Sequence, residues 1–212
     1  MSVRVKICGL KDRAAVEAAV EYGAAYVGFV FVPKSPRFIT VSEAASLIAH
    51  ISRKVATVGL FVDPSDQDIV SVLDGACFDV LQLHGSETPQ RVAEVKALTG
   101  LPVIKAIGVS SSEDVVASHR YRDVADMLLF DAKPPAGGTE GGNGAVFDWE
   151  KLKDINLDKP WFLSGGLDMG NIGKATDLTG ARFLDVSSGV EASRGVKSLE
   201  KIKLFLGEAA RL

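Results

Sequence analysis

The chain has 212 residues and a formal net charge of −3, with 47% hydrophobic and 24% charged residues. This composition is ordinary for a folded globular protein, and the lack of a basic excess argues against a nucleic-acid partner. No apolar run is long enough for a membrane-spanning helix, so we expect no membrane partner. The two cysteines, Cys8 and Cys77, cannot form a disulfide framework, and the charged N-terminus does not resemble a signal peptide. We therefore expect a cytoplasmic protein with reduced thiols.

Short β-rich runs alternate along the chain with longer segments of helical periodicity. The predicted strands are residues 3–7, 26–31, 56–61, 80–83, 102–107, 127–130, 161–163 and 183–186. Helices are predicted over residues 12–22, 41–51, 89–98 and 199–210, where apolar residues recur at spacings of three and four. Successive strands start 22 to 34 residues apart, which is typical of a repeated strand–helix unit.

Eight such units predict a (β/α)₈ barrel, the TIM barrel fold, as a single catalytic domain over residues 1–212. A doubly wound open sheet also alternates strands with helices, but eight parallel strands in so short a chain fit a barrel better. No Pro/Ser-rich linker divides the sequence. The longest irregular stretch, residues 132–145, predicts a lid or a binding loop after the sixth strand.

The active site of such a barrel is built at the C-terminal ends of its strands. Chemically useful residues gather at these predicted ends: Cys8 after the first strand, Arg37 beyond the second, His84 after the fourth, Asp131 after the sixth, Gly165 and Gly166 after the seventh, and Asp185, Ser188 and Gly189 at the eighth. Loops are hydrophilic in general. That tendency explains single positions, but it does not explain why Cys, His, Asp and Gly-Gly all fall at strand ends.

Several short motifs follow one another in the order of a known family. They are KICGL (residues 6–10), SPR (35–37), QLHG (82–85), LFD (129–131), GGNG (141–144), FDW (147–149), LSGGL (163–167) and DVSSGVE (185–191). Together they resemble the phosphoribosylanthranilate isomerase family of tryptophan biosynthesis. The resemblance implies a (β/α)₈ barrel and an Amadori rearrangement of N-(5-phosphoribosyl)anthranilate, an aminoaldose, to the aminoketose. It implies neither a metal nor an organic cofactor.

The same resemblance makes Cys8 the general base and Asp131 the general acid. Period-two alternation places Cys8 on the inner face of the first strand, above Lys6. Only about 3% of an ordinary thiol is ionised at pH 7, so a nearby cation such as Lys6 would help the base. Asp131 ends an apolar strand, and apolar surroundings favour the protonated carboxyl of a general acid. The alternatives are a structural cysteine and an aspartate that caps a loop.

The substrate phosphate is expected at the glycine-rich ends of the seventh and eighth strands. Gly165, Gly166, Ser188 and Gly189 would bind it through backbone N–H groups and the N-terminus of a short helix, which is the usual phosphate position in these barrels. A lone Gly-Gly normally marks only a turn. Two such loops on neighbouring strands predict a phosphate site.

Three further residues are candidates for substrate binding. The resemblance assigns Arg37 to the anthranilate carboxylate, which a bidentate guanidinium fits; the alternative is a solvated loop arginine. His84 would contact the substrate or only line the pocket. Asp185 would orient the substrate or form a structural ion pair. Because the first and eighth strands close the barrel, we expect buried Lys6 to pair with Asp185 beneath Cys8, unless the first strand is rotated and Lys6 reaches solvent.

Two other functions are compatible with the barrel. Another phosphate-binding barrel enzyme, such as indole-glycerol-phosphate synthase or a pentose-phosphate epimerase, would place a catalytic lysine and glutamates, metal ligands or an Asp pair at the strand ends. A non-catalytic sensor of a phosphorylated ligand would lack the base or the acid. The spacing of His, Asp and Cys predicts no metal site. We expect a monomer that acts on a phosphorylated small molecule, with a dimer as the alternative.

Overall fold

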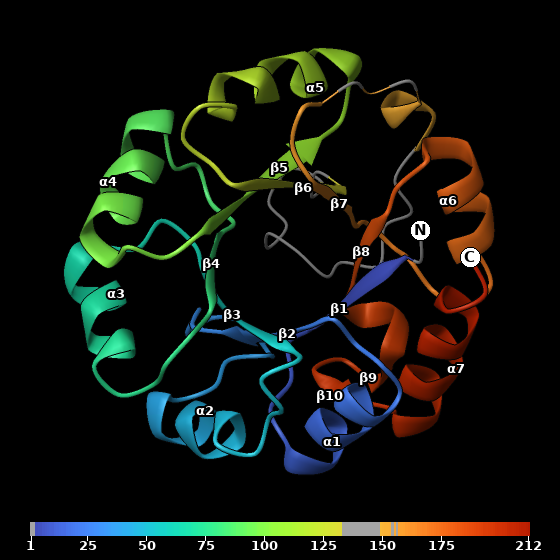
Figure 1. The fold of residues 1–212 in the computed structure, drawn as a ribbon, viewed down its shortest axis with the longest axis horizontal. Coiled ribbons are helices and arrows are strands. Elements are labelled where there is room, and N and C mark those ends of the chain that lie inside the picture. The colour runs from blue at the N-terminus through green and yellow to red at the C-terminus, as the bar shows by residue number, and fades with distance from the viewer. Residues whose placement is uncertain (1–2, 133–148, 154, 156) are drawn as a thin grey trace.

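Eight parallel strands close into a barrel, in chain order, in the computed structural model, which describes residues 3–132, 149–153, 155 and 157–212. The strands are β1 (Arg4–Cys8), β2 (Tyr26–Val30), β3 (Ala56–Phe61), β4 (Val80–Leu83), β5 (Val103–Val109), β6 (Met127–Ala132), β7 (Trp161–Leu163) and β8 (Phe183–Val186). Figure 1 looks along the barrel and shows these strands around the centre with the helices outside them. The predicted (β/α)₈ barrel is confirmed.

The outer layer is formed by helices that follow the strands. They are α1 (Arg13–Glu21), α2 (Val41–Ile48), α3 (Asp66–Leu73), α4 (Pro89–Thr99), α5 (Ser112–Ser118), α6 (Ile172–Thr179) and α7 (Leu199–Ala209). Short 3-10 helices lie at η1 (His119–Tyr121), η2 (Trp149–Leu152) and η3 (Ser188–Val190). The four predicted helices correspond to α1, α2, α4 and α7. The sequence analysis did not predict α3, α5 and α6, which have only seven or eight residues each.

Alternation along β1 places its side chains as the sequence predicts. Val5 and Ile7 belong to the main core between the strands and the helices. Lys6 and Cys8 face into the barrel and are buried, with 0% and 5% of their surface exposed. The barrel closes where β1 pairs with β8, and there Lys6 lies opposite Asp185. This register brings a cation and a carboxylate from the two ends of the chain to the same place.

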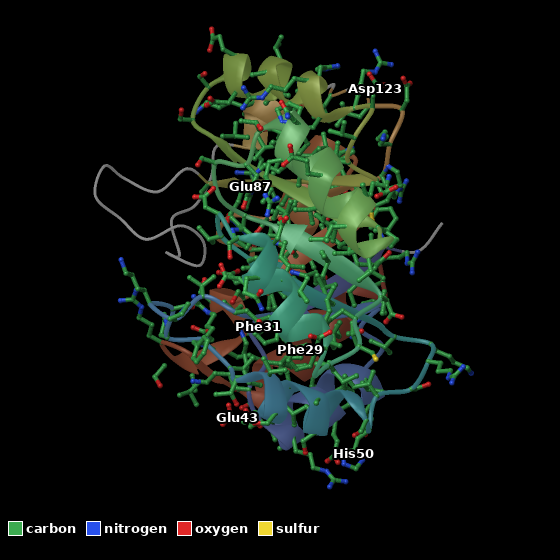
Figure 2. All side chains as sticks on the ribbon, turned by 90° about the vertical axis from the view of Figure 1, so that its left-hand side faces the viewer. Phe29, Phe31, Glu43, His50, Glu87 and Asp123 are labelled. Atoms are coloured by element: carbon green, nitrogen blue, oxygen red, sulfur yellow. The ribbon has the colours of Figure 1, made fainter. Side chains whose placement is uncertain are left out.

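The barrel interior is apolar toward the N-terminal ends of the strands and polar toward their C-terminal ends. Seven residues form the apolar interior cluster: Tyr26, Val58, Val80, Ile104, Ala106, Leu129 and Phe162. At the start of β1, the Arg4 guanidinium lies 5.0 Å from the ring centroid of Tyr26, a member of this cluster. Figure 2 shows the two ends of the barrel: Glu87, which follows β4, lies on the left, while His50 and Asp123, which precede β3 and β6, lie on the right. The candidate site residues belong to the end marked by Glu87.

A small hairpin after β8 is absent from the sequence-based prediction. Its strands are β9 (Glu191–Ser193) and β10 (Val196–Lys197), and they pair antiparallel. The predicted lid or binding loop, apart from Ala132, lies outside the described residues. Within the described part of the chain, no helix is both long enough and apolar enough to cross a membrane.

Candidate active site

Cys8 lies above a buried ion pair at the seam between β1 and β8. The Lys6 Nζ is 2.8 Å from the Asp185 Oδ1, and the two side chains are 0% and 6% exposed. A Cβ built on neighbouring Gly28 would lie 3.2 Å from the Cys8 Sγ and 3.3 Å from the Lys6 Nζ, so the thiol and the ammonium line one small space. The predicted Lys6–Asp185 pair is confirmed, and the alternative of a rotated, solvent-exposed Lys6 is wrong.

Two lysines act on the Cys8 thiol. Burial raises the pKa of Cys8 above its ordinary value, while the ammonium groups of Lys6 and Lys197 oppose that shift and Asp185 adds to it. Burial alone would lower the pKa of Lys6, but Asp185 and Cys8 outweigh it, so the Lys6 pKa is raised and the residue stays charged. The two ammonium groups therefore reduce, but do not cancel, the penalty that burial imposes on the thiolate.

Asp131 lies at the end of β6, three strands from Cys8 through β7 and β8. It is buried, with 7% of its surface exposed. Its Oδ1 accepts a hydrogen bond from the backbone N–H of Ala132 at 2.9 Å. Its Oδ2 is 3.3 Å from the His84 Nε2, and the His84 Nδ1 is 2.9 Å from the Gln82 Nε2. His84 thus contacts the candidate acid directly, and Gln82 lies behind it.

Arg37 is buried rather than solvated. Its Nε and Nη2 donate to the two carboxylate oxygens of Glu191, at 2.7 and 3.0 Å. The Lys197 Nζ donates to the same carboxylate at 3.1 Å and to the Ser187 carbonyl at 2.9 Å. Burial alone would raise the pKa of Glu191, but its hydrogen bond from Arg37 and the charge of Lys197 outweigh burial and lower it. The β9–β10 hairpin therefore fixes the position of Arg37.

The loops after β7 and β8 meet at the same end of the barrel. Gly165 and Gly166 both have a positive φ, 82° and 74°, a conformation that favours glycine. A Cβ on Gly189 would lie 1.9 Å from the Leu167 carbonyl oxygen, so only glycine fits there. Among the described residues, none of the backbone hydrogen bonds outside helices and strands uses the N–H groups of Gly165, Gly166, Ser188 or Gly189.

Metal binding has no candidate among the described residues, because no group of three or more His, Cys, Asp or Glu side chains could hold an ion there. The reactive groups of the candidate site are the Cys8 thiol and the Asp131 carboxyl, and Lys6 and Arg37 are the fixed hydrogen-bond donors near them.

The model of the N-(5'-phosphoribosyl)anthranilate (PRA) isomerase family matches residues 5–208. An N-(5'-phosphoribosyl)anthranilate isomerase of Paracoccus denitrificans is 54% identical over 210 residues, which cover 99% of this chain and 98% of that protein. The chain belongs to the N-(5'-phosphoribosyl)anthranilate isomerase family.

Solved structures of this family superpose over almost the whole chain. A phosphoribosylanthranilate isomerase from Thermotoga maritima has a TM-score of 0.88 and 36% identity, covering 99% of this chain and 100% of that one. A second isomerase structure holds reduced 1-(o-carboxyphenylamino)-1-deoxyribulose 5-phosphate, with a TM-score of 0.84 and 34% identity over the same shares of the two chains. As a member of the isomerase family, the chain is an enzyme of tryptophan biosynthesis, as the sequence motifs implied.

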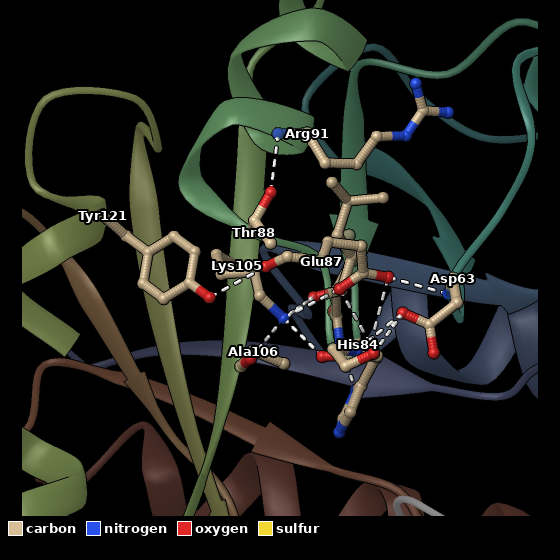
Figure 3. A network of polar contacts seen from close by, with 12 residues as sticks. Asp63, His84, Glu87, Thr88, Arg91, Lys105, Ala106 and Tyr121 are labelled. Atoms are coloured by element: carbon tan, nitrogen blue, oxygen red, sulfur yellow. Dashed lines mark hydrogen bonds and ion pairs between the residues drawn. The ribbon is translucent and has the colours of Figure 1, made fainter. Parts of the chain in front are cut away.

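Sequence reasoning missed a polar network that joins Lys105 on β5 to the loop after β4, beside the candidate site. The Lys105 Nζ donates to the Glu87 Oε2 at 2.8 Å and to the carbonyl oxygens of Gly85 and Ala106 at 2.7 and 2.9 Å. The Tyr121 hydroxyl donates to the Glu87 carbonyl at 2.8 Å. Figure 3 shows this network beside His84. The available signal was Lys105 itself, a charged residue between Ile104 and Ala106 in an apolar strand.

Replacing Lys6 with methionine should raise the pKa of Cys8 further. The substitution removes a cation and leaves the Asp185 carboxylate without its partner, and both changes disfavour the thiolate. The midpoint of the pH profile of Cys8 alkylation should move up by about one pH unit or more. Lys203→Met, which removes a lysine packed over the Tyr22 ring on the outer layer, is the control. An unshifted midpoint in Lys6→Met would show that Lys6 does not act on the thiol.

Proposed function

We propose that this chain converts N-(5'-phosphoribosyl)anthranilate to 1-(2-carboxyphenylamino)-1-deoxyribulose 5-phosphate by general acid–base catalysis, with Cys8 as base and Asp131 as acid. The observation that carries the proposal is the pair of buried groups at one barrel mouth. The Cys8 thiol on β1 lies beside the fixed ammonium of Lys6, and the Asp131 carboxyl on β6 lies against the imidazole of His84, which follows β4. The ligand of one related structure is a reduced form of this product.

The chemistry needs two groups that act on different atoms of one sugar. Asp131 gives a proton to the ring oxygen, which opens the ring to a Schiff base. The Cys8 thiolate then removes the proton from C2', and the resulting enolamine gains a proton at C1' and loses one from its C2' hydroxyl to become the ketone. Protons only change position, so no cofactor is consumed. Acid and base on separate strands suit this sequence.

The neighbouring residues have supporting roles in this proposal. The Lys6–Asp185 pair keeps a positive charge beside the thiol. The Oδ1 of Asp185 contacts Lys6, whereas its Oδ2 lies 3.4 Å from the hydroxyl of Ser164, which follows β7. His84 contacts Asp131 rather than only lining the pocket. Arg37, fixed by Glu191, binds the anthranilate carboxylate.

The phosphate site in this proposal is formed by the backbone N–H groups of Gly165, Gly166, Ser188 and Gly189. Support comes from the positive φ of the first two residues and from the close approach of Gly189 to the β7–α6 loop. Phosphates commonly bind at this position in (β/α)₈ barrels. All of the site comes from one chain, so the proposal needs no second copy. We also infer one catalytic domain over residues 1–212 and a cytoplasmic location.

The direct test is turnover of N-(5'-phosphoribosyl)anthranilate, followed by the loss of its fluorescence on adding the purified protein. Turnover is expected, and its absence in a folded preparation would contradict the proposed activity. The phosphate site is tested by comparing Gly166→Asp with Gly166→Asn, two substitutions that impose similar backbone strain. The aspartate also places a negative charge against the phosphate, so its KM should be at least about tenfold above that of the asparagine variant. Equal KM values would place the phosphate elsewhere.

Gly189 is not suited to the same experiment. A side chain there would strike the Leu167 carbonyl oxygen, so a substitution disturbs the packing of η3 as well as the phosphate position. An effect of Gly189→Asp would therefore not separate anion binding from folding.

A further inference from the structure

Gln82 is a polar residue in the middle of the barrel. It lies on β4 with 0% of its surface exposed, and it faces inward, in step with Val80 below and His84 above. Its strand neighbours in register are Leu60 and Ile104. Burying an amide is unfavourable unless it is well hydrogen-bonded, and the Gln82 Oε1 has no hydrogen-bond partner among the described residues. Leucine would fill this space without that cost, so packing does not explain the glutamine.

Among the described residues, the Gln82 amide makes its one side-chain hydrogen bond with His84. Its Nε2 lies 2.9 Å from the His84 Nδ1. An amide nitrogen only donates hydrogen bonds, so the Nδ1 must accept, and the ring proton of neutral His84 must then be on Nε2. This orientation leaves the Oε1 and one N–H without a partner among the described residues, whereas the reversed amide would leave both N–H groups without one. Buried N–H groups without a partner are rarer than such carbonyl oxygens, which favours the first orientation.

The Nε2 proton of His84 points at the candidate general acid. The His84 Nε2 is 3.3 Å from the Asp131 Oδ2, while the Asp131 Oδ1 is engaged by the backbone N–H of Ala132. In the Nε2–H tautomer His84 therefore donates to the carboxylate. In the Nδ1–H tautomer a lone pair would face the same oxygen, and the ring could not donate to the carboxylate.

We propose that Gln82 is a positioning residue that holds His84 in the Nε2–H tautomer, so that His84 stabilises the Asp131 carboxylate formed when the acid gives up its proton. This inference rests on the role of Asp131 in the proposed function. A hydrogen-bond donor beside the carboxyl stabilises the carboxylate that is left when the proton moves to the substrate, and so assists the transfer step. The amide is neutral, so it fixes the tautomer without favouring the doubly protonated ring, as a carboxylate at this position would.

The tautomer is measured by long-range ¹H–¹⁵N correlation spectra of the histidine rings in the uniformly labelled protein, well above the ordinary titration range of histidine. The chain has only three histidines, and the signals lost in His84→Asn identify His84. The native protein should show the Nε2–H pattern. Gln82→Glu, which places an acceptor beside Nδ1, should change it to the Nδ1–H or doubly protonated pattern. An Nδ1–H pattern in the native protein would overturn the proposal.

A double-mutant cycle tests whether Gln82 acts through His84. Gln82→Met should lower kcat about tenfold, part of the range typical of acid–base catalysis, with KM changed less than about twofold. In a His84→Asn background the same substitution should lower kcat no further. Gln67→Glu, on the exposed face of α3, is the control. Fully multiplicative effects in the cycle would show that Gln82 acts by packing, and would overturn the proposal.

The two measurements separate the outcomes. If Gln82→Met does not fold, as judged by circular dichroism, Gln82→Glu keeps the shape of the side chain and the spectra of the native protein still decide. If the native protein lacks turnover but shows the Nε2–H tautomer, the proposed function fails while the Gln82–His84 arrangement stands. If turnover is normal and the tautomer is Nδ1–H, only the Gln82 proposal fails.

Discussion

Cys8→Ala and Asp131→Asn should each lower kcat by about 10²-fold or more, because general acid–base catalysis typically contributes 10²–10⁴-fold. Both side chains are buried and project into the barrel mouth. Asp131→Asn keeps the shape of the side chain, and Cys8→Ala removes only the sulfur atom. Binding of a product analogue should change much less than kcat. Fluorescence-based turnover measures the first quantity, and titration with the reduced product analogue measures the second.

The chain offers a matched control for each substitution. Cys77→Ala removes the exposed cysteine, and Asp158→Asn removes a carboxylate whose side chain is 82% exposed. Both controls should retain native turnover. Near-normal kcat in Cys8→Ala or in Asp131→Asn would refute that residue's role, and an equal loss in the controls would point to general destabilisation.

Lys105→Met should lower the free energy of unfolding by about 3–5 kcal/mol, because it leaves a buried carboxylate without its counter-ion. The Lys105 and Glu87 side chains are only 2% and 1% exposed. Glu87 also accepts hydrogen bonds from the backbone N–H groups of Asp63 and Gly85. The network therefore joins β3 to the loop that carries His84. Urea unfolding measures the loss, and an unchanged m-value would show that the substitution altered stability alone.

Two further variants test whether the loss of stability in Lys105→Met comes from the unpaired buried charge. Arg122→Met breaks an ion pair whose side chains are 57% and 82% exposed, and it should cost less than about 1 kcal/mol. Glu87→Gln combined with Lys105→Met should be less destabilised than Lys105→Met alone, since the unpaired charge is gone. A loss under about 1 kcal/mol in Lys105→Met would mean that the pair does not hold the loop.

Local patterns in the sequence predicted the strands and their inward faces well. The alternation in β1 correctly placed Lys6 and Cys8 inside the barrel, and the closure of the first strand on the eighth correctly paired Lys6 with Asp185. Both inferences follow from the period of two in a strand and from the cost of an unpaired buried charge. The helices α3, α5 and α6 were not predicted; with seven or eight residues each, they give only about two turns in which the helical spacing can repeat.

The sequence by itself determined the family, the strand order and the residues at each strand end, because motifs and periodicity are local properties of the chain. Only the tertiary structure decided which of those residues touch. It placed His84 against Asp131 rather than merely in the pocket, tied Arg37 to Glu191, and buried Lys105 on Glu87. Such contacts join strands and loops far apart in the chain, and they depend on barrel register and loop path, which no local pattern encodes.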